Sequence, residues 1–222
     1  MGKKRIKRKK SGISTLGGDQ AKLTFVSYDI VFDPIEDKKD IYKDPELDQA
    51  KEKIYYDTHK NPKKCVSRLL PLIEKYPDDP VLYNYLYAAY SLMGEQAKAD
   101  DITIETYRKF PDYLFGKIGY VEKCLRDDNL DEIPRILDNK YDLKSHYPDR
   151  TKFHITEFTS FVGTVGFYFC RIKKLEIAEK YYEILKGVAP NDPQTKRLES
   201  ALKISRSMTV LEKLTRLIGK KP

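Results

Sequence analysis

The most regular feature of the chain is an apolar period of three and four residues, which predicts helices over most of its length. The segment Val81–Met93 shows it best, with Gly94 as the stop that ends the helix. One face of this helix carries Tyr83, Leu86, Tyr87, Ala89 and Tyr90. A second helix is predicted over Ala97–Lys109, ending before Pro111. The pattern therefore predicts helices joined in pairs by short turns.

A short motif of an aromatic residue, proline and aspartate recurs along the chain. It occurs as Tyr76-Pro77-Asp78, Phe110-Pro111-Asp112 and Tyr147-Pro148-Asp149, with 34 and 37 residues between the prolines. A looser copy, Ala189-Pro190-Asn191, follows 42 residues later. Two helices in each interval of about 34 residues are typical of a helical-hairpin solenoid, in which each hairpin covers the apolar face of its neighbour.

The spacing divides residues 46–192 into four predicted units and leaves a helical C-terminus. The units are 46–79, 80–113, 114–150 and 151–192, and they are followed by capping helices over 193–219. In the third unit Pro134 falls early in the second helix, which is expected to be cut short at Leu137. In the fourth unit Gly163 and Gly166 lie inside a helix, where they indicate a close approach of a neighbouring helix.

The units resemble the tetratricopeptide repeat family. Unit 80–113 matches the family intervals at Tyr83, Leu86, Ala89-Tyr90, Gly94, Ala99 and Pro111. Unit 151–192 matches at Val165-Gly166, Phe169, Ala178, Tyr182 and Pro190. The first helix of unit 46–79 is out of phase by two residues near Asn61-Pro62, and unit 114–150 matches least. The resemblance implies an all-α, right-handed solenoid of about four units.

The resemblance also implies a binding groove, because in this family the first helices of successive repeats line a concave surface that binds peptides. Carried over position by position, the lining residues are Asn84, Ala88, Ser91, Ile118, Glu122, Leu125, Gly163 and Phe167. Family members that hold chaperone C-terminal carboxylates use Lys, Arg and Asn in the groove, and Asn84 alone fits that pattern. We therefore expect an apolar peptide or helix of another protein as the ligand.

The segment 21–45 differs from the rest, because Lys22–Phe32 alternates in the manner of a strand. One face of it carries Thr24, Val26, Tyr28, Ile30 and Phe32. No second strand is predicted anywhere in the chain. A lone strand leaves its backbone groups without partners, so it must dock on the body, pair with another chain or stay extended. We expect it to lie against its own solenoid and to cover part of it.

The C-terminal residues past Pro193 predict two helices, Gln194–Ser205 and Ser207–Ile218, with Ser207 as the N-cap of the second. An apolar stripe on the second helix comprises Met208, Leu211, Leu214, Leu217 and Ile218. Solenoids need terminal caps with one polar face, which is the favoured interpretation. The alternative is that this helix contacts a partner or mediates dimerisation.

Composition and hydropathy limit the classes of protein to which the chain can belong. The chain has 222 residues, of which 40% are hydrophobic and 34% charged, and its mean hydropathy is −0.63. Its longest uncharged stretch in the most apolar region, Phe158–Cys170, is 13 residues long and too short to cross a bilayer. No apolar segment follows the basic N-terminus, so a secretory signal is not expected. With three dispersed cysteines, the expected location is the cytoplasm, or the nucleus in a eukaryote.

Charge is concentrated at the N-terminus. Of the net charge of +8, a cluster within residues 3–10 supplies seven, which leaves +1 for the rest. The cluster comprises Lys3, Lys4, Arg5, Lys7, Arg8, Lys9 and Lys10. Residues 1–20 are therefore expected to be a disordered basic tail and linker. The tail is a tether to RNA, DNA, ribosome or anionic lipid, or a nuclear import signal, or else a solvated terminus without a partner.

Catalytic chemistry is not expected. The three histidines, His59, His146 and His154, are scattered, and no metal-ligand or nucleophile motif is present. His154 and Glu157 suggest an acid–base pair on paper, but a surface ion pair is the favoured interpretation. The sequence thus predicts a scaffold that binds another protein without catalysis, cofactor or metal. The alternative function is an adaptor tethered to nucleic acid or ribonucleoprotein by the basic tail. The oligomeric state stays open.

Overall fold

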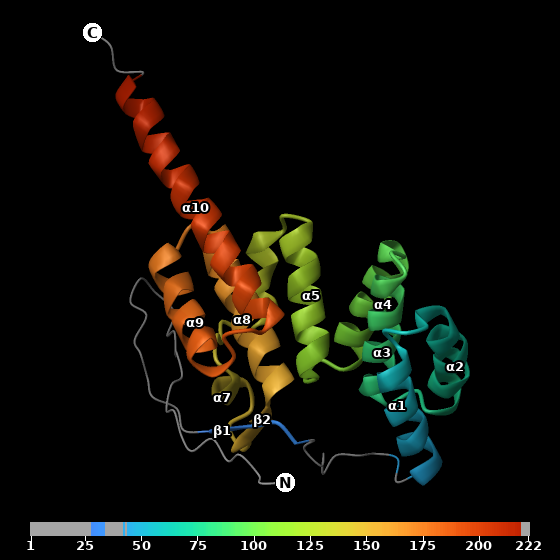
Figure 1. The fold of residues 1–222 in the computed structure, drawn as a ribbon. Helices are drawn as coiled ribbons and strands as arrows, with labels where there is room; N and C mark the ends of the chain where they lie inside the picture. The colour runs from blue at the N-terminus through green and yellow to red at the C-terminus, as the bar shows by residue number, and fades with distance from the viewer. Residues whose placement is uncertain (1–27, 34–41, 43, 219–222) are drawn as a thin grey trace. The chain divides into compact units, whose positions relative to one another are not determined.

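The computed structural model describes residues 28–33, 42 and 44–218, and this part of the chain is mainly helical, as predicted (Figure 1). Ten α-helices, one 3-10 helix and two short strands occur in the described residues. The chain divides into two compact units. Residues 36–127 form the N-terminal unit, and residues 1–35 together with 128–222 form the C-terminal unit.

The N-terminal unit contains five helices. They are α1 (Pro45–Asp57), α2 (Pro62–Lys75), α3 (Pro80–Leu92), α4 (Gln96–Lys109) and α5 (Leu114–Arg126). Each helix packs against the next one in the sequence, and α3 also contacts α1 and α5. The alternate helices α1, α3 and α5 therefore lie next to one another, in addition to the consecutive ones.

Three of these helices begin with the same local device, an Asp or Asn followed by proline. The side chains of Asp44, Asn61 and Asp79 each accept a hydrogen bond from a backbone N–H in the first turn, at 2.9, 3.1 and 2.9 Å. Proline fits the first helical position because it has no N–H to satisfy and its φ is already helical. These helix starts are therefore specified locally by the sequence.

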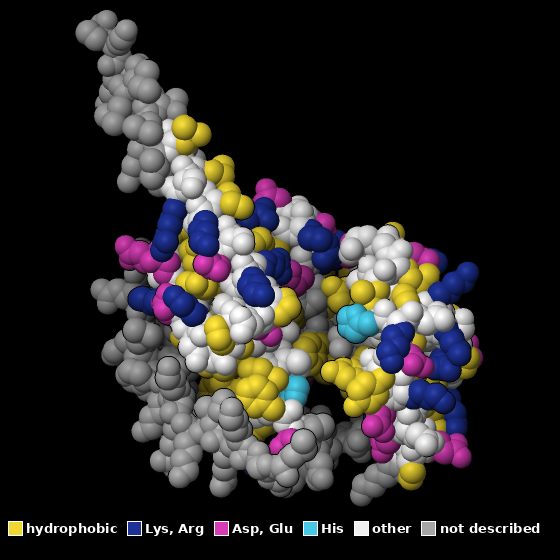
Figure 2. Space-filling view, viewed as in Figure 1, with side chains coloured by type: hydrophobic (Ala, Val, Ile, Leu, Met, Phe, Trp, Pro, Cys, Tyr) yellow, Lys and Arg dark blue, Asp and Glu magenta, His cyan; other side chains and the backbone are white. Residues whose placement is uncertain are grey.

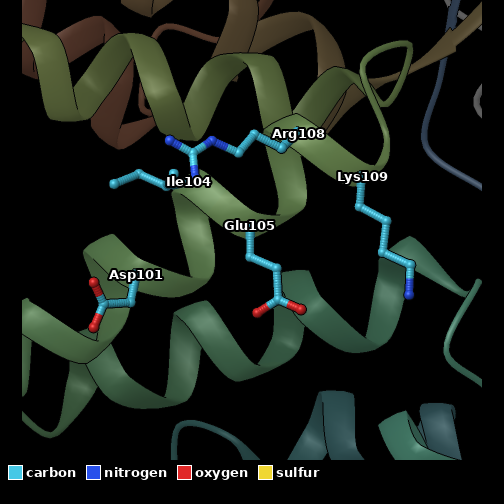
Figure 3. Close-up of a pocket in the computed structure, with 5 residues that line it drawn as sticks. All are labelled: Asp101, Ile104, Glu105, Arg108 and Lys109. Atoms are coloured by element: carbon cyan, nitrogen blue, oxygen red, sulfur yellow. The ribbon is translucent and has the colours of Figure 1, made fainter.

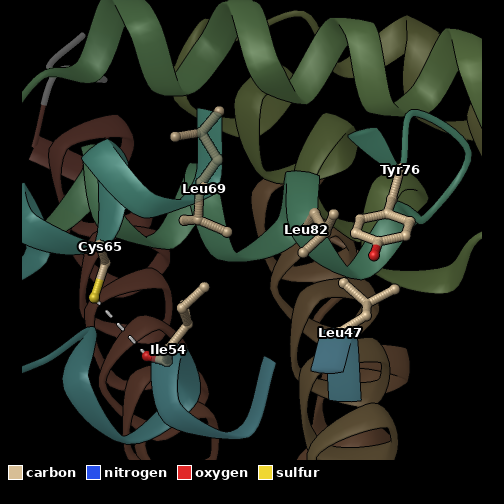
Figure 4. Packing of buried hydrophobic residues seen from close by; sticks show 7 residues of the cluster. Leu47, Ile54, Cys65, Leu69, Tyr76 and Leu82 are labelled. Carbon is tan, nitrogen blue, oxygen red and sulfur yellow. Dashed lines mark hydrogen bonds between the residues drawn. The ribbon is translucent and has the colours of Figure 1, made fainter. Parts of the chain in front are cut away.

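The core of the N-terminal unit joins α1, α2 and α3 (Figure 4). It is formed by Leu47, Ile54, Cys65, Leu69, Tyr76, Leu82 and Leu86, none more than 6% exposed. The Cys65 thiol lies 4.0 Å from the Ile54 carbonyl oxygen. The Tyr76 hydroxyl donates to the Asp44 carboxylate, and this hydrogen bond lowers the pKa of Asp44. The end of α2 thereby holds the residue that caps α1.

The C-terminal unit is less regular. Its elements are β1 (Asp29–Val31), η1 (Leu130–Glu132), α6 (Ile133–Ile136), α7 (Leu143–His146), β2 (Lys152–His154), α8 (Ile155–Arg171), α9 (Leu175–Val188) and α10 (Pro193–Ile218). Helices α8, α9 and α10 pack on one another. As predicted, Pro134 lies in the first turn of a helix that is cut short, α6, which ends at Ile136.

The prediction that no second strand exists is wrong. Strand β1 pairs in parallel with β2, with Ile30 opposite Phe153. The ring of Tyr28 packs edge-on against Phe153, with ring centroids 5.0 Å apart. Residues 28–33 therefore dock on their own chain, as expected, while residues 22–27 of the predicted strand lie outside the described residues. Three-residue strands show too little alternation to be recognised before their partner is known.

The two helices predicted past Pro193 form a single helix, α10. Ser207 lies inside it and is not an N-cap, since its hydroxyl donates to the Lys203 carbonyl at 3.0 Å. The apolar residues change face along the helix: Leu202 is 3% exposed, whereas Ile204 is 62% exposed. In the sequence this change of face looks like the end of one helix and the start of another, but the helical backbone continues without a break.

The predicted close approach at Gly166 is confirmed. A Cβ atom there would lie 2.5 Å from Leu198 Cδ2 on α10 and 2.8 Å from Tyr181 Cβ on α9. Glycine allows both helices to pack this closely. Within the described part of the chain, no helix is both long and apolar enough to cross a membrane.

Candidate protein-interaction surface

The predicted groove residues of α3 lie on one accessible face. Asn84, Ala88 and Ser91 follow one another at spacings of four and three, and all three are half-buried. The Ser91 hydroxyl oxygen is buried and has no hydrogen-bond partner among the described residues. A polar group in that state is costly, and a ligand that supplies a partner would remove the cost.

The predicted groove residues of α5 are mostly covered. Ile118 is 8% exposed and Leu125 only 1%, whereas Glu122 is half-buried. Glu122 is thus the most accessible of the three. In the structure as it stands, this part of the predicted lining offers a ligand little apolar area.

The two predicted groove residues in the C-terminal unit contact α10. A Cβ atom on Gly163 would lie 2.7 Å from Gln194 Cβ. The guanidinium carbon of Arg197 lies 4.1 Å from the centre of the Phe167 ring, in a cation–π contact. The first turns of α10 therefore cover both positions.

Three tyrosines that the sequence analysis did not select form an aromatic cluster on the N-terminal unit. Tyr55 and Tyr56 on α1 are 58% and 62% exposed, and their ring centroids are 5.4 Å apart. The Tyr85 ring on α3 lies 6.3 Å from that of Tyr55. Burial raises the pKa of Tyr85, which is half-buried. We call Tyr55, Tyr56 and Tyr85 the tyrosine surface.

The tyrosine surface adjoins the predicted groove residues. Tyr85 precedes Ala88 by three residues on α3, and Ala88 precedes Leu92, which is 47% exposed, by four. The sequence analysis missed Tyr55 and Tyr56 because α1 is out of phase with the repeat. The connection between α1 and α2, residues 58–61, is one residue longer than that between α3 and α4, residues 93–95, so the shift is one residue and not the two that were expected. Two consecutive tyrosines in a helical segment were the available signal.

A depression of about 510 Å³ lies on α4, lined by Asp101, Ile104, Glu105, Arg108 and Lys109 (Figure 3). Figure 3 shows the charged ends of these side chains pointing in different directions. The Lys109 ammonium is already hydrogen-bonded to the Pro77 carbonyl at 2.7 Å and to the Tyr83 hydroxyl at 3.1 Å. The depression therefore does not bring its titratable groups to one point.

His154 and Glu157 serve the start of α8, and Glu157 pairs with Arg150 rather than with His154. The Arg150 guanidinium donates two hydrogen bonds to the Glu157 carboxylate, at 2.9 and 2.7 Å. The same carboxylate accepts from the His154 backbone N–H at 2.9 Å, which completes a capping box. Glu157 thus forms an ion pair, but its partner is Arg150 and not His154. Among the described residues, no cluster of His, Cys, Asp or Glu is arranged to hold a metal ion.

The predicted tether residues, Lys3 to Lys10, lie outside the described residues. No family model, no curated protein and no solved structure matches this chain. The resemblance to tetratricopeptide repeats therefore depends on the residues of the sequence and on the way the helices pair.

Proposed function

We propose that this chain is a non-catalytic scaffold of the tetratricopeptide type, a right-handed solenoid of paired helices that binds a peptide or helix of another protein. The pairing of consecutive helices supports it, together with the contacts of α3 with α1 and α5 and of α10 with α8. Contacts between both neighbouring and alternate helices are what a stack of hairpins produces. Gly166 supplies the small residue that the family has at such a contact.

The observation that carries the proposal is the tyrosine surface. Tyr55 and Tyr56 expose more than half of their surface on adjacent positions of one helix. Tyrosine is enriched at protein interfaces, because its ring buries a large apolar area while its hydroxyl keeps a hydrogen bond. Two neighbouring exposed rings with a third beside them are therefore a favourable site for an apolar ligand segment.

The charges near this surface favour a ligand without a terminal carboxylate. Lys51, on α1, is only 13% exposed at its side chain and pairs with Asp79 at 3.1 Å and with Asp48 at 3.4 Å. This ammonium is therefore already engaged by two carboxylates. The surface offers aromatic rings, the amide of Asn84 and the hydroxyl of Ser91, which suit an uncharged extended segment or an amphipathic helix.

The proposal is tested with peptides selected by phage display on the full chain. The affinity of the selected peptides is then measured for the variant Tyr56→Ala by calorimetry. We expect a loss of about tenfold, as for a modest interface hot spot. Leu70→Ala is the matched control, because Leu70 is 47% exposed and lies on α2, which carries none of the three tyrosines.

Equal affinities for Tyr56→Ala and the unmodified chain would contradict the proposed surface.

The alternative function is distinguished by a pull-down of the full chain and of the chain lacking residues 1–19, each with and without nuclease. Recovery of the same proteins in all four samples supports the scaffold. Recovery that depends on the tail or is abolished by nuclease supports tethering to nucleic acid instead.

A further inference from the structure

Helix α10 extends beyond the helices that it packs on (Figure 1). Its first half is held in the C-terminal unit by Leu198 and Leu202, which are 0% and 3% exposed. The polar contacts of α10 with its neighbours reach Ser205 Oγ, 3.2 Å from Cys170 Sγ at the end of α8, and Arg206, which pairs with Glu179 on α9. The second half of α10 continues past this point to Ile218 and projects from the unit.

An exposed apolar stripe begins just before the projecting half and continues along it. Ile204, Met208 and Leu211 follow at spacings of four and three and are 62%, 56% and 64% exposed. At 100° per residue this stripe lies about a third of a turn away from the face that buries Leu198 and Leu202. Figure 2 shows hydrophobic side chains along this part of the helix. The stripe therefore does not extend the packing face of the first half.

The sequence of the same segment is strongly basic. Residues 203–221 contain Lys203, Arg206, Lys213, Arg216, Lys220 and Lys221, against the single acidic residue Glu212. Among the side chains that the structure describes here, Arg206 pairs with Glu179 on α9 and Lys203 with Glu199. The segment from Leu211 onward adds four Lys or Arg residues and one Glu. A cationic excess thus accompanies the apolar stripe.

We propose that the second half of α10 binds the surface of an anionic lipid bilayer, with Ile204, Met208 and Leu211 inserted among the acyl chains near the headgroups. An apolar stripe on a helix rich in Lys and Arg is the pattern of an interfacial helix, whose affinity combines apolar burial with attraction to anionic lipids. The basic cluster Lys3–Lys10 supplies a second polybasic element. This proposal goes beyond the proposed scaffold and does not depend on it.

Charge favours an anionic bilayer over a second copy of the chain as the surface that covers this stripe. Two α10 helices joined along the stripe would bring together two segments of the same cationic excess, which repel each other. An anionic bilayer supplies the opposite charge along the whole helix and a continuous apolar phase beneath it. Two other partners remain as outcomes of the experiment: a second copy of the chain, and an acidic protein with an apolar groove.

The chain contains no tryptophan, so one introduced tryptophan reports on its own surroundings. The full-length variant Met208→Trp is mixed with vesicles of phosphatidylcholine and phosphatidylserine, or of phosphatidylcholine alone. We expect a blue shift of its fluorescence with the anionic vesicles only, because the indole leaves water for the interface. Leu92→Trp, at an exposed position of α3, is the matched control and should not shift.

Vesicle binding is then measured by co-sedimentation for the double variant Ile204→Ser/Leu211→Ser. Binding should fall by about tenfold or more, since two apolar side chains no longer leave water. Both residues are exposed, so the fold is expected to be retained, and Leu70→Ser is the control for an exposed apolar residue elsewhere. Higher salt should weaken binding of the unmodified chain.

Four results would overturn the proposal. Absence of binding to anionic vesicles excludes it directly. Co-sedimentation without a shift of Met208→Trp assigns lipid binding to the N-terminal cluster alone. A blue shift without vesicles, together with a dimer in sedimentation velocity that Ile204→Ser/Leu211→Ser abolishes, assigns the stripe to a second copy. A shift that only an acidic protein produces assigns it to that protein.

Discussion

The two units use different means to build a helical core. In the N-terminal unit, α1 to α5 follow one another with short connections, and three of them begin with the same Asp-Pro or Asn-Pro device. In the C-terminal unit the chain between Asp128 and His154 forms only short helices, and two strands fold against the start of α8. Regular pairing is therefore sufficient in one unit, whereas the other needs additional contacts.

Tyrosines supply many of those contacts. The Tyr181 hydroxyl, on α9, donates to the Tyr141 carbonyl at 2.8 Å and so satisfies backbone in the irregular segment. The Tyr141 ring in turn packs against Phe169 on α8, with centroids 5.1 Å apart. An irregular segment can be buried only when its backbone groups find partners, and here side chains from longer helices provide one. The comparison shows that a shortened helix is compensated by aromatic side chains from its neighbours.

The largest effect in this comparison is expected for Phe153→Ala in β2. Phe153 is fully buried, contacts the Tyr28 ring and lies 4.3 Å below the Arg150 guanidinium. Loss of a buried phenylalanine ring should lower the free energy of unfolding of the C-terminal unit by about 3–5 kcal/mol. Hydrogen exchange read by mass spectrometry should show this loss in residues 128–208 and leave the N-terminal unit less affected.

The control for that variant is Phe32→Ala, because Phe32 follows β1 directly and is 55% exposed. It should change the free energy of unfolding by no more than about 0.5 kcal/mol. The amide of Asp29, which donates to the Thr151 carbonyl at 2.9 Å, should lose protection in Phe153→Ala only. Equal protection in both variants would mean that Phe153 does not hold the N-terminal strand.

A smaller effect should distinguish glycines in the two units. Gly166→Ala places a methyl group 2.5 Å from Leu198 Cδ2 and 2.8 Å from Tyr181 Cβ, so α9 or α10 must move. We expect a loss of about 1–3 kcal/mol in unfolding free energy by denaturant titration. Gly119→Ala on α5 meets Thr103 Cγ2 at 3.4 Å, an ordinary contact, and should gain up to about 1 kcal/mol from helix propensity. The same sign for both variants would remove this distinction.

The smallest effect concerns alkaline pH. In the C-terminal unit burial raises the pKa of Tyr141 from 10.0 to about 12 and also raises those of Tyr168 and Tyr181. The fold favours the neutral phenols, so their contribution to stability is complete below pH 10. It is lost as the pH rises from 10 through 12, because the unfolded chain ionises first.

Burial also raises the pKa of Tyr85 in the N-terminal unit, where the nearby Lys51 opposes the shift. Hydrogen exchange between pH 9 and 11, corrected for the intrinsic rate of each amide, should therefore show a steeper loss of protection in the C-terminal unit. A loss of the same size in both units would show that the buried tyrosines of the C-terminal unit do not control its alkaline stability.

The sequence by itself determined the helices and where most of them begin and end. Apolar periodicity, the Asx-Pro starts and Pro134 are local signals, because a helix forms its backbone hydrogen bonds within four residues. For the same reason the shortened α6 was predictable. The close approach at Gly166 was predictable on a different ground, because glycine inside a helix is unfavourable unless a neighbour needs the space.

Only the tertiary structure decided three further features. Strand β1 pairs with a strand more than a hundred residues away, and the three residues of β2 around Phe153 are too few to show a strand pattern in the sequence. Helix α10 continues through the change of its apolar face because its backbone bonds do not depend on what covers the side chains. The exposure of Tyr55 and Tyr56 depends on how α1 packs on α2 and α3. The apolar period of one helix does not determine which other helices it contacts.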